Sequence, residues 1–267
     1  MFRFARLPVF LAVVLVIALG ALAVSYGPFR LTGTGANEAT SVNLDDGLVG
    51  YWKFEDLVDG VIDSSGKANN GLRIKGSGAP GRYGRAVRLD GDDDAHVSIP
   101  ASQSLNDFSD QITVSAWVLP HSPPEGFVVV ASRQIEALQH PDQFYLGFGL
   151  KDGVTHYKWH LGTIKWWSRK DRSIYAGTPA SDRWIHMAGV YDGTIMRLYI
   201  DGEEIGSQAQ TGKIRVDDNP VTIGGEENGA EPHIVDAEFE GLIDEVRIYN
   251  RALNSAAIEA IYLLPPP

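Results

Sequence analysis

Short segments in which apolar and polar residues alternate follow one another from residue 47 almost to the end of the chain. This period of two is typical of half-buried β-strands. Pairs such as Asp192-Gly193 and Asp201-Gly202 separate the segments, and they favour tight hairpins because they tolerate positive φ. Many short strands at near-even spacing predict an all-β fold of two antiparallel sheets, a sandwich or jelly roll.

The expected elements have the lengths usual for such a fold. A short helix is expected only near the end, at residues 256–262, where Asn254 can cap its first turn and the PPP run of residues 265–267 ends it. We expect strands at residues 48–54, 71–75, 86–89, 95–99, 112–119, 127–132, 144–150, 155–161, 184–191, 194–200, 203–207, 221–223 and 238–249.

Charge and composition narrow the class of function. The 267-residue chain has a formal net charge of -11, which argues against nucleic acid as a partner because phosphates require a basic surface. It contains no cysteine, so disulfides, thiolate metal sites and thiol nucleophiles are excluded.

The first thirty residues resemble an export signal. Arg3 and Arg6 precede an apolar run from Val9 to Tyr26, which predicts either a signal peptide cleaved near Ala23 or an uncleaved transmembrane anchor. In both cases the rest of the chain is expected outside the cytoplasm. We therefore predict a signal or anchor at residues 1–30, a flexible linker at 31–46 and one folded domain at 47–264.

Five motifs in order resemble the LamG-like jelly-roll family of the concanavalin A-like lectin/glucanase superfamily. They span almost everything from residue 47 to 262, and residues 134–179 match the family least. The resemblance implies two antiparallel sheets with the first and last strands adjacent. The motifs are GLVGYWKFED with IDSSGKANNGL, then GRAVRLDGDDDAHVSIP, ITVSAWVLP, DRWIHMAGVYDGTIMRLYIDGEEIG and EGLIDEVRIYNRAL.

Asp244 falls in phase with the apolar face of the predicted closing strand, with Leu242 and Val246. A carboxylate that faces a core must be paired, hydrogen-bonded or bound to a metal. Its partners are therefore expected to be an arginine or backbone amides, or else a calcium ion, which prefers oxygen ligands. Family members often have a structural calcium near here, so the resemblance implies a site in which Glu55, Asp63 and Asp244 are the candidate ligands.

The superfamily also contains glucanases, which place their carboxylates on one strand as E-x-D-x-x-E. Glycoside hydrolysis requires two such carboxylates beside the scissile bond. When that pattern is centred on Asp244, Leu242 and Arg247 stand at the glutamate positions. We therefore expect a domain without catalytic activity.

Aromatic residues crowd into HYKWHLGTIKWWSRKDRSIYAG, residues 156–177. Flat aromatic rings beside hydrogen-bonding groups bind sugars. Tyr157, Trp159, His160, Trp166 and Trp167 are therefore the candidate ligand-binding residues, with the alternative that some of these rings fill the core.

These patterns leave three functions open. The first is an exported binding module for a glycan, and the second is a module that binds a cell-surface protein for adhesion or scaffolding. The third is a divergent glycoside hydrolase. Fold alone does not choose among them.

Overall fold

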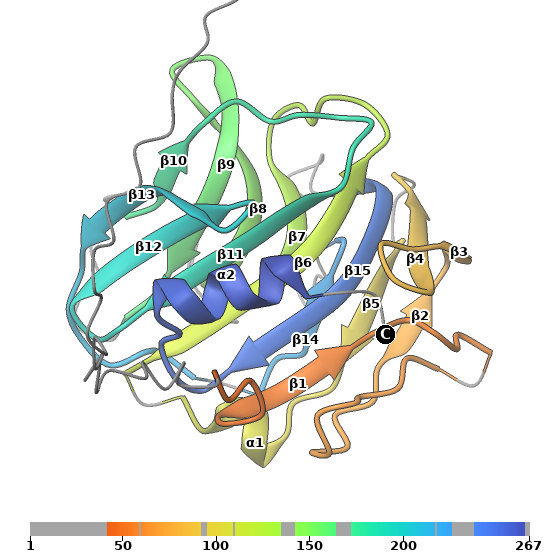
Figure 1. The fold of residues 1–267 in the computed structure, drawn as a ribbon, viewed down its shortest axis with the longest axis horizontal. Helices are drawn as coiled ribbons and strands as arrows, with labels where there is room; N and C mark the ends of the chain where they lie inside the picture. Colours follow the sequence, from red (N-terminus) through yellow and green to blue (C-terminus); the bar gives the residue numbers. More distant parts are fainter. Residues whose placement is uncertain are drawn as a thin grey trace, which may run out of the picture. The chain divides into compact units, whose positions relative to one another are not determined.

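The computed structural model describes residues 42–58, 60–91, 95–108, 110–134, 142–163, 172–216, 218–225 and 238–264. These residues belong to one of two compact units, residues 41–267, and form two stacked antiparallel sheets (Figure 1). The predicted all-β sandwich with a short C-terminal helix is therefore confirmed, and a second short helix, at residues 103–106, was not predicted. The predicted signal or anchor at residues 1–30 lies outside the described residues. In the part of the chain that is described, no helix is long and apolar enough to cross a membrane.

The eight-stranded sheet has the order β13-β12-β11-β6-β15-β4-β3, and β1 also pairs with β15. Its strands are β1 (Leu48–Trp52), β3 (Ser77–Pro80), β4 (Arg85–Asp90), β6 (Ile112–Pro120), β11 (Ile185–Tyr191), β12 (Ile195–Ile200), β13 (Glu203–Ala209) and β15 (Glu240–Tyr249).

The seven-stranded sheet has the order β10-β9-β8-β7-β14-β5-β2. Its strands are β2 (Leu72–Ile74), β5 (His96–Ile99), β7 (Val128–Gln134), β8 (Asp142–Lys151), β9 (Val154–Leu161), β10 (Ile174–Ala176) and β14 (Val221–Ile223). A short helix, α1 (Gln103–Asn106), follows β5.

The first and last strands are adjacent, as predicted. β15 pairs with β4 along its first half and with β1 along its second half, while β6 pairs with its other edge. The closing strand thus joins the N-terminal and central parts of the sheet.

The main core lies between the sheets and buries large side chains such as Trp52, Phe144 and Trp159. The two sheets approach closely where β11 has Gly189, because a Cβ atom there would lie 2.2 Å from the Trp159 ring. That spacing is far below van der Waals contact, so only glycine fits beneath this indole.

A second core lies on the outer face of the eight-stranded sheet. The helix α2 (Ser255–Leu263) packs across this face and buries Ala257, Ile258 and Ile261 (Figure 1). Asn254 caps the helix as predicted, since its side chain accepts a hydrogen bond from the Ala257 amide at 2.9 Å.

Residues at the end of the predicted linker contact the domain. Arg251 donates hydrogen bonds to the Asn43 carbonyl at 2.9 Å and to the Asp46 carbonyl at 2.6 Å. Leu44 packs against the apolar cluster beneath α2. The ordered contacts thus begin a few residues before position 47.

Candidate functional site

The outer face of the seven-stranded sheet holds the candidate site. Along β8 and β9, Phe144, Leu146, Tyr157 and Trp159 belong to the main core. Because successive side chains of a strand point to opposite faces, the residues between them face outward. On β9 these include Lys158 and His160. The outward face therefore combines aromatic, basic and hydroxyl side chains.

Lys158 is the centre of this face. Its Nζ lies 4.4 Å from the centre of the Tyr145 ring, 4.8 Å from that of Phe127 and 5.7 Å from that of Tyr175. Its side chain is only 8% exposed. An ammonium group over aromatic faces is attracted by the ring quadrupoles, so these contacts hold the lysine in place.

Two glycines on β8 make this arrangement possible. A Cβ atom at Gly149 would lie 2.7 Å from Lys158 Cδ and 2.9 Å from the Tyr175 ring. A Cβ atom at Gly147 would lie 2.2 Å from the Val128 carbonyl oxygen. We call Phe127, Tyr145, Lys158 and Tyr175 the lysine–aromatic cluster.

A row of polar groups crosses the sheet beside this cluster. The hydroxyls of Ser132 and Thr222 lie 2.9 Å apart, and His160 Nδ1 lies 3.1 Å from the Ser173 hydroxyl. Strand register places these residues side by side in the order Ser98, Thr222, Ser132, Tyr145 and His160. Gln143 is fully buried, and its amide oxygen and nitrogen have no hydrogen-bond partner among the described residues.

The accessible groups of this face suit recognition of a polar ring; they are Phe127, Tyr175, His160 and Ser98, whereas Ser132, Thr222, Tyr145 and Gln143 are buried. Aromatic faces pack against C–H groups, while hydroxyl, imidazole and amide groups exchange hydrogen bonds with hydroxyls. The fully buried Gln143 amide is out of reach of a ligand at the surface, so an ordered water is the partner that offsets the free energy of leaving it unpaired.

The predicted aromatic platform is only partly on this face. Tyr157 and Trp159 are 3% and 0% exposed and lie in the main core, so the prediction that their rings bind a ligand is wrong. His160 does face outward, and Trp166 and Trp167 lie outside the described residues. The alternation of the strand could have predicted this division. Its apolar residues Tyr157, Trp159 and Leu161 point inward, whereas Lys158 and His160 point outward. Lys158 and Tyr145 were missed.

Asp244 does not face the main core. A bulge between Asp244 and Arg247, with Glu245 at φ +54°, shifts the alternation of β15. Ile243, Val246 and Ile248 therefore point inward, and Asp244 points to the outer face of the eight-stranded sheet. The phase inferred from the sequence was wrong, because it assumed a regular strand.

The Asp244 carboxylate accepts hydrogen bonds from backbone amides. Tyr83 N–H donates to Oδ2 at 3.0 Å, and the amides of Glu245 and Arg82 also favour the charged form. Burial nevertheless raises the pKa of Asp244 to about 7. Backbone amides are among the partners predicted for this group, and they lie against it here.

The candidate calcium ligands do not come together. Both carboxylate oxygens of Asp63 accept hydrogen bonds, from the amides of Tyr51, Ser65 and Asn69 and from the Ser65 hydroxyl. Glu55 accepts the Arg85 amide at 3.2 Å. No group of three His, Cys, Asp or Glu side chains that could hold a metal ion occurs in the described part of the chain. These three residues therefore do not fit a shared metal site.

Glu245 is also committed to protein contacts. It is 3% exposed, its carboxylate lies 2.5 Å from Arg247 Nη2, and it accepts a hydrogen bond from the Tyr51 hydroxyl at 2.5 Å. A pair of acids that cleaves a glycoside must reach the sugar from both sides. Asp244 and Glu245 are buried neighbours on β15, so they cannot flank a substrate in this way.

Comparison with known families supports the fold and its class. The family model described as the concanavalin A-like lectin/glucanases superfamily matches residues 90–259, more than half of the chain. The chain belongs to this superfamily. The resemblance inferred from the five motifs is thereby confirmed. The matched region of the chain runs from the end of β4 into α2 and includes the whole lysine–aromatic cluster.

Solved structures share the superfamily fold at low identity. The binding domain of Paraclostridial Mosquitocidal Protein 1 is 21% identical with a TM-score of 0.60, over 82% of this chain and 52% of that one. Domain 4 of AbnA, an extracellular GH43 arabinanase from Geobacillus stearothermophilus in complex with arabinotriose, is 21% identical with a TM-score of 0.57, over 80% and 98%.

One relative is an adhesion receptor. The chain is 27% identical over 194 residues to adhesion G-protein coupled receptor V1 of Danio rerio. The alignment spans 71% of this chain but 3% of the receptor. The likeness therefore concerns a small part of a much longer protein.

Proposed function

We propose that this chain is an exported, non-catalytic module that binds carbohydrate on the outer face of its seven-stranded sheet. The observation on which this rests is the lysine–aromatic cluster beside the row of hydroxyl, imidazole and amide groups. Rings give a sugar an apolar surface, and the polar row gives its hydroxyls partners.

The relatives are compatible with binding. The arabinanase domain is described in complex with arabinotriose, and the mosquitocidal protein domain is described as a binding domain. A Trypanosoma rangeli sialidase shares the fold at 16% identity, over 33% of its length. Export is supported by the apolar run after Arg3 and Arg6.

The absence of catalysis is supported by the acids of the closing strand. The positions that would hold glutamates are Leu242 and Arg247, and both carboxylates that are present are buried. Calcium remains a prediction from the sequence, although Glu55, Asp63 and Asp244 do not form its site. Thermal unfolding with and without a chelator tests it, and an unchanged midpoint would contradict it.

A second candidate is a protein-binding module for adhesion. The relative that favours it is the adhesion receptor of Danio rerio, whose alignment spans 71% of this chain. In that case the same aromatic face would contact protein, since aromatic and basic side chains are also enriched at protein interfaces.

A glycan array separates these two functions. We expect binding of a defined set of glycans, weakened between about twofold and tenfold by Phe127→Ala or Tyr175→Ala, because each change removes a ring from the cluster. Leu263→Ala is the control. It removes an exposed apolar side chain from α2, the helix that covers the eight-stranded sheet. No glycan binding by a folded protein would contradict the carbohydrate proposal, and equal weakening by Leu263→Ala would contradict the site.

A further inference from the structure

The two sheets end side by side at an edge that no other described strand covers. β2 is the last strand of the seven-stranded sheet, and β3 is the last of the eight-stranded sheet. Both are short, of three and four residues. Within the described residues β3 pairs along one side only, and the free side of β2 is met only just before its start, where Gly71 bridges to Val61. We call this region, with residues 55–58, the open edge; it lies at the right of Figure 1.

Two arginines face into the space between the sheets at the open edge. Arg73 of β2 pairs with Val97, a core residue, and Arg85 of β4 lies two positions before the core residue Val87. Alternation therefore turns both side chains toward the inside of the sandwich. They line a hollow of about 550 Å³ together with Glu55, Asp56, Leu57, Val58 and Gly78.

Neither guanidinium is neutralised by a neighbour in the described residues. Arg73 donates to the Gly76 carbonyl, and its guanidinium makes no ion pair there. The Arg85 guanidinium lies against β3 at Gly78, where a Cβ atom would come within 2.6 Å of Nη2. The Arg85 side chain likewise has no ion pair with a described carboxylate. Two such groups from different sheets can bind one carboxylate.

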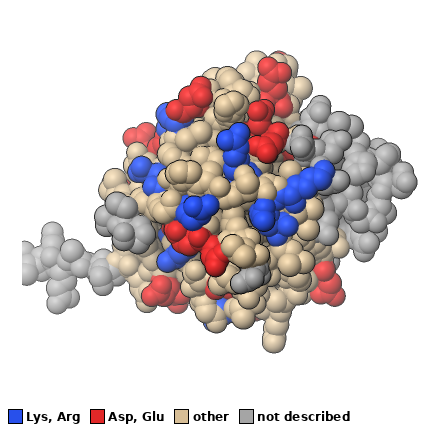
Figure 2. Space-filling view, turned by 90° about the vertical axis from the view of Figure 1, so that its right-hand side faces the viewer, with Lys and Arg blue, Asp and Glu red and all other residues tan. Residues whose placement is uncertain are grey.

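Two acids and two arginines line the hollow, but the carboxylates of Glu55 and Asp56 accept the backbone amides of Arg85 and Val58. The stretch of chain that forms this edge is also more basic than the chain as a whole. Residues 53–90 contain seven Lys and Arg against five Asp and Glu, whereas the whole chain has a net charge of -11. Figure 2 looks onto this side of the molecule and shows Lys and Arg side chains gathered near its centre. Charge complementarity thus favours an acidic ligand here.

Large apolar side chains are exposed beside the same arginines. Val58 is 88% exposed and Leu72 is 61% exposed, and Ile62 and Ile74 are also exposed. Exposed apolar groups next to charged ones mark surfaces that contact other proteins. An open strand edge also offers main-chain groups that pair with an extended peptide.

We propose that the open edge docks an extended acidic segment of a partner protein. One carboxylate of that segment binds between Arg73 and Arg85, and its apolar side chains contact Val58 and Leu72. Its main chain runs beside β2 or β3. This surface is separate from the lysine–aromatic cluster, so one domain can hold a glycan and a protein together.

Selection from a random displayed peptide library tests this with the folded full chain. We expect the enriched peptides to be acidic and apolar, and to bind at least about tenfold more weakly to the double variant Arg73→Ala, Arg85→Ala, because two charge-assisted contacts are lost. Binding is expected to weaken as salt is raised. The control is Lys213→Ala with Arg183→Ala, which removes the same charge elsewhere.

Several outcomes overturn the proposal. These are no enrichment, enrichment of neutral or basic peptides, or equal binding by the double variant; the arginines would then only protect the edge from strand pairing. If an oligogalacturonate binds and loses affinity in the double variant while no peptide does, the ligand is an acidic glycan instead. Glycan binding that is weakened by Tyr175→Ala but unchanged in the arginine variant leaves the carbohydrate proposal standing in every case.

Discussion

Asp244 lies on the outer face of its sheet because one residue, Glu245, takes a positive φ. The resulting bulge turns the carboxylate toward the amides of Arg82 and Tyr83. The backbone of Gly81 also lies against the carboxylate, so that a Cβ atom at this position would be only 2.6 Å from Asp244 Oδ2. Oδ2 of Asp244 therefore accepts a hydrogen bond from the backbone, whereas Oδ1 has no hydrogen-bond partner among the described residues.

We expect Asp244→Asn to remove a pH dependence of stability. Burial raises the pKa of Asp244 to about 7, whereas an unfolded aspartate has a pKa of about 3.9. Between these values the folded protein holds a proton that the unfolded chain has released. The free energy of unfolding therefore falls as pH rises from about 4 to 7, by roughly 1.4 kcal/mol per unit of pKa difference.

Urea unfolding at pH 5 and pH 8 measures this effect. Relative to the wild type, the Asp244→Asn variant should have a higher free energy of unfolding at pH 8 than at pH 5. Its amide oxygen still accepts a hydrogen bond from the Tyr83 amide, and no buried charge forms. If the difference in stability between wild type and variant is the same at both pH values, the proposed protonation is wrong.

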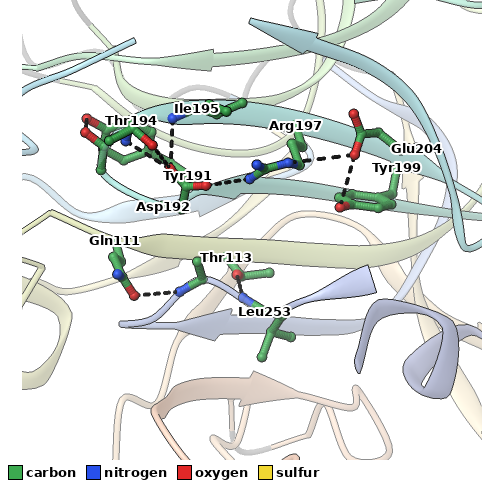
Figure 3. A network of polar contacts seen from close by, with 12 residues as sticks. Gln111, Thr113, Tyr191, Asp192, Thr194, Ile195, Arg197, Tyr199, Glu204 and Leu253 are labelled. Carbon is green, nitrogen blue, oxygen red and sulfur yellow. Dashed lines mark hydrogen bonds and ion pairs between the residues drawn. The ribbon is translucent and has the colours of Figure 1, made fainter. Parts of the chain in front are cut away.

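The hairpin of β11 and β12 depends on an aspartate at its turn (Figure 3). Asp192 Oδ1 accepts hydrogen bonds from the Thr194 amide and hydroxyl and from the Ile195 amide, at 2.7 to 2.9 Å. Its Oδ2 lies 2.6 Å from Arg197 Nη1. Partial burial tends to raise the pKa of Asp192, but these hydrogen bonds outweigh it and hold the pKa well below its usual range.

We expect Asp192→Asn to destabilise the protein by about 1 kcal/mol near neutral pH, since charge-assisted hydrogen bonds at a partly exposed site are lost. A folded pKa below the unfolded value means that this stabilisation is present above about pH 4 and is lost as pH falls further.

Urea unfolding at pH 7 and pH 3 checks this. The difference between wild type and variant should shrink at pH 3. Asp152→Asn, in the exposed turn between β8 and β9, should change stability little at either pH. A difference for Asp192→Asn that is constant with pH would contradict the role given to its charge.

The whole domain shares one core that begins with β1. Trp52 is fully buried, its indole N–H donates to the Asn69 carbonyl at 2.9 Å, and its strand pairs with β15. Residues from both ends of the domain thus meet in one sheet. Loss of the first strand should therefore affect the entire molecule.

Two truncations test this. A chain that begins at Val42 should unfold cooperatively by circular dichroism, because it keeps the core and the contacts of Arg251 with residues 43 and 46. A chain that begins at Lys53 should lose this cooperative transition, because it lacks β1 and Trp52. If the shorter chain melts at the same temperature, β1 is not part of the cooperative core.

Much of the fold followed from local pattern. The hairpins, the helix cap at Asn254 and most strands were predicted, because alternation and turn residues act over a few positions. β3 and β10 were missed, since GSGAPG and the short IYA segment have little apolar alternation. Their pairing with longer neighbours makes them strands.

The sequence by itself predicted the antiparallel sandwich, because apolar alternation must be buried on one face. Its five motifs carried the resemblance that implied the superfamily and the adjacent first and last strands. The tertiary structure decided which face each functional group occupies. A bulge at Glu245 turns Asp244 away from the main core, and packing against Gly189 places the Trp159 ring in the core rather than on the surface. Strand register then brought Lys158 to Tyr145 and Tyr175, and sheet stacking placed Arg73 and Arg85 around one hollow. Such contacts join residues distant in the chain, so no local pattern contains them.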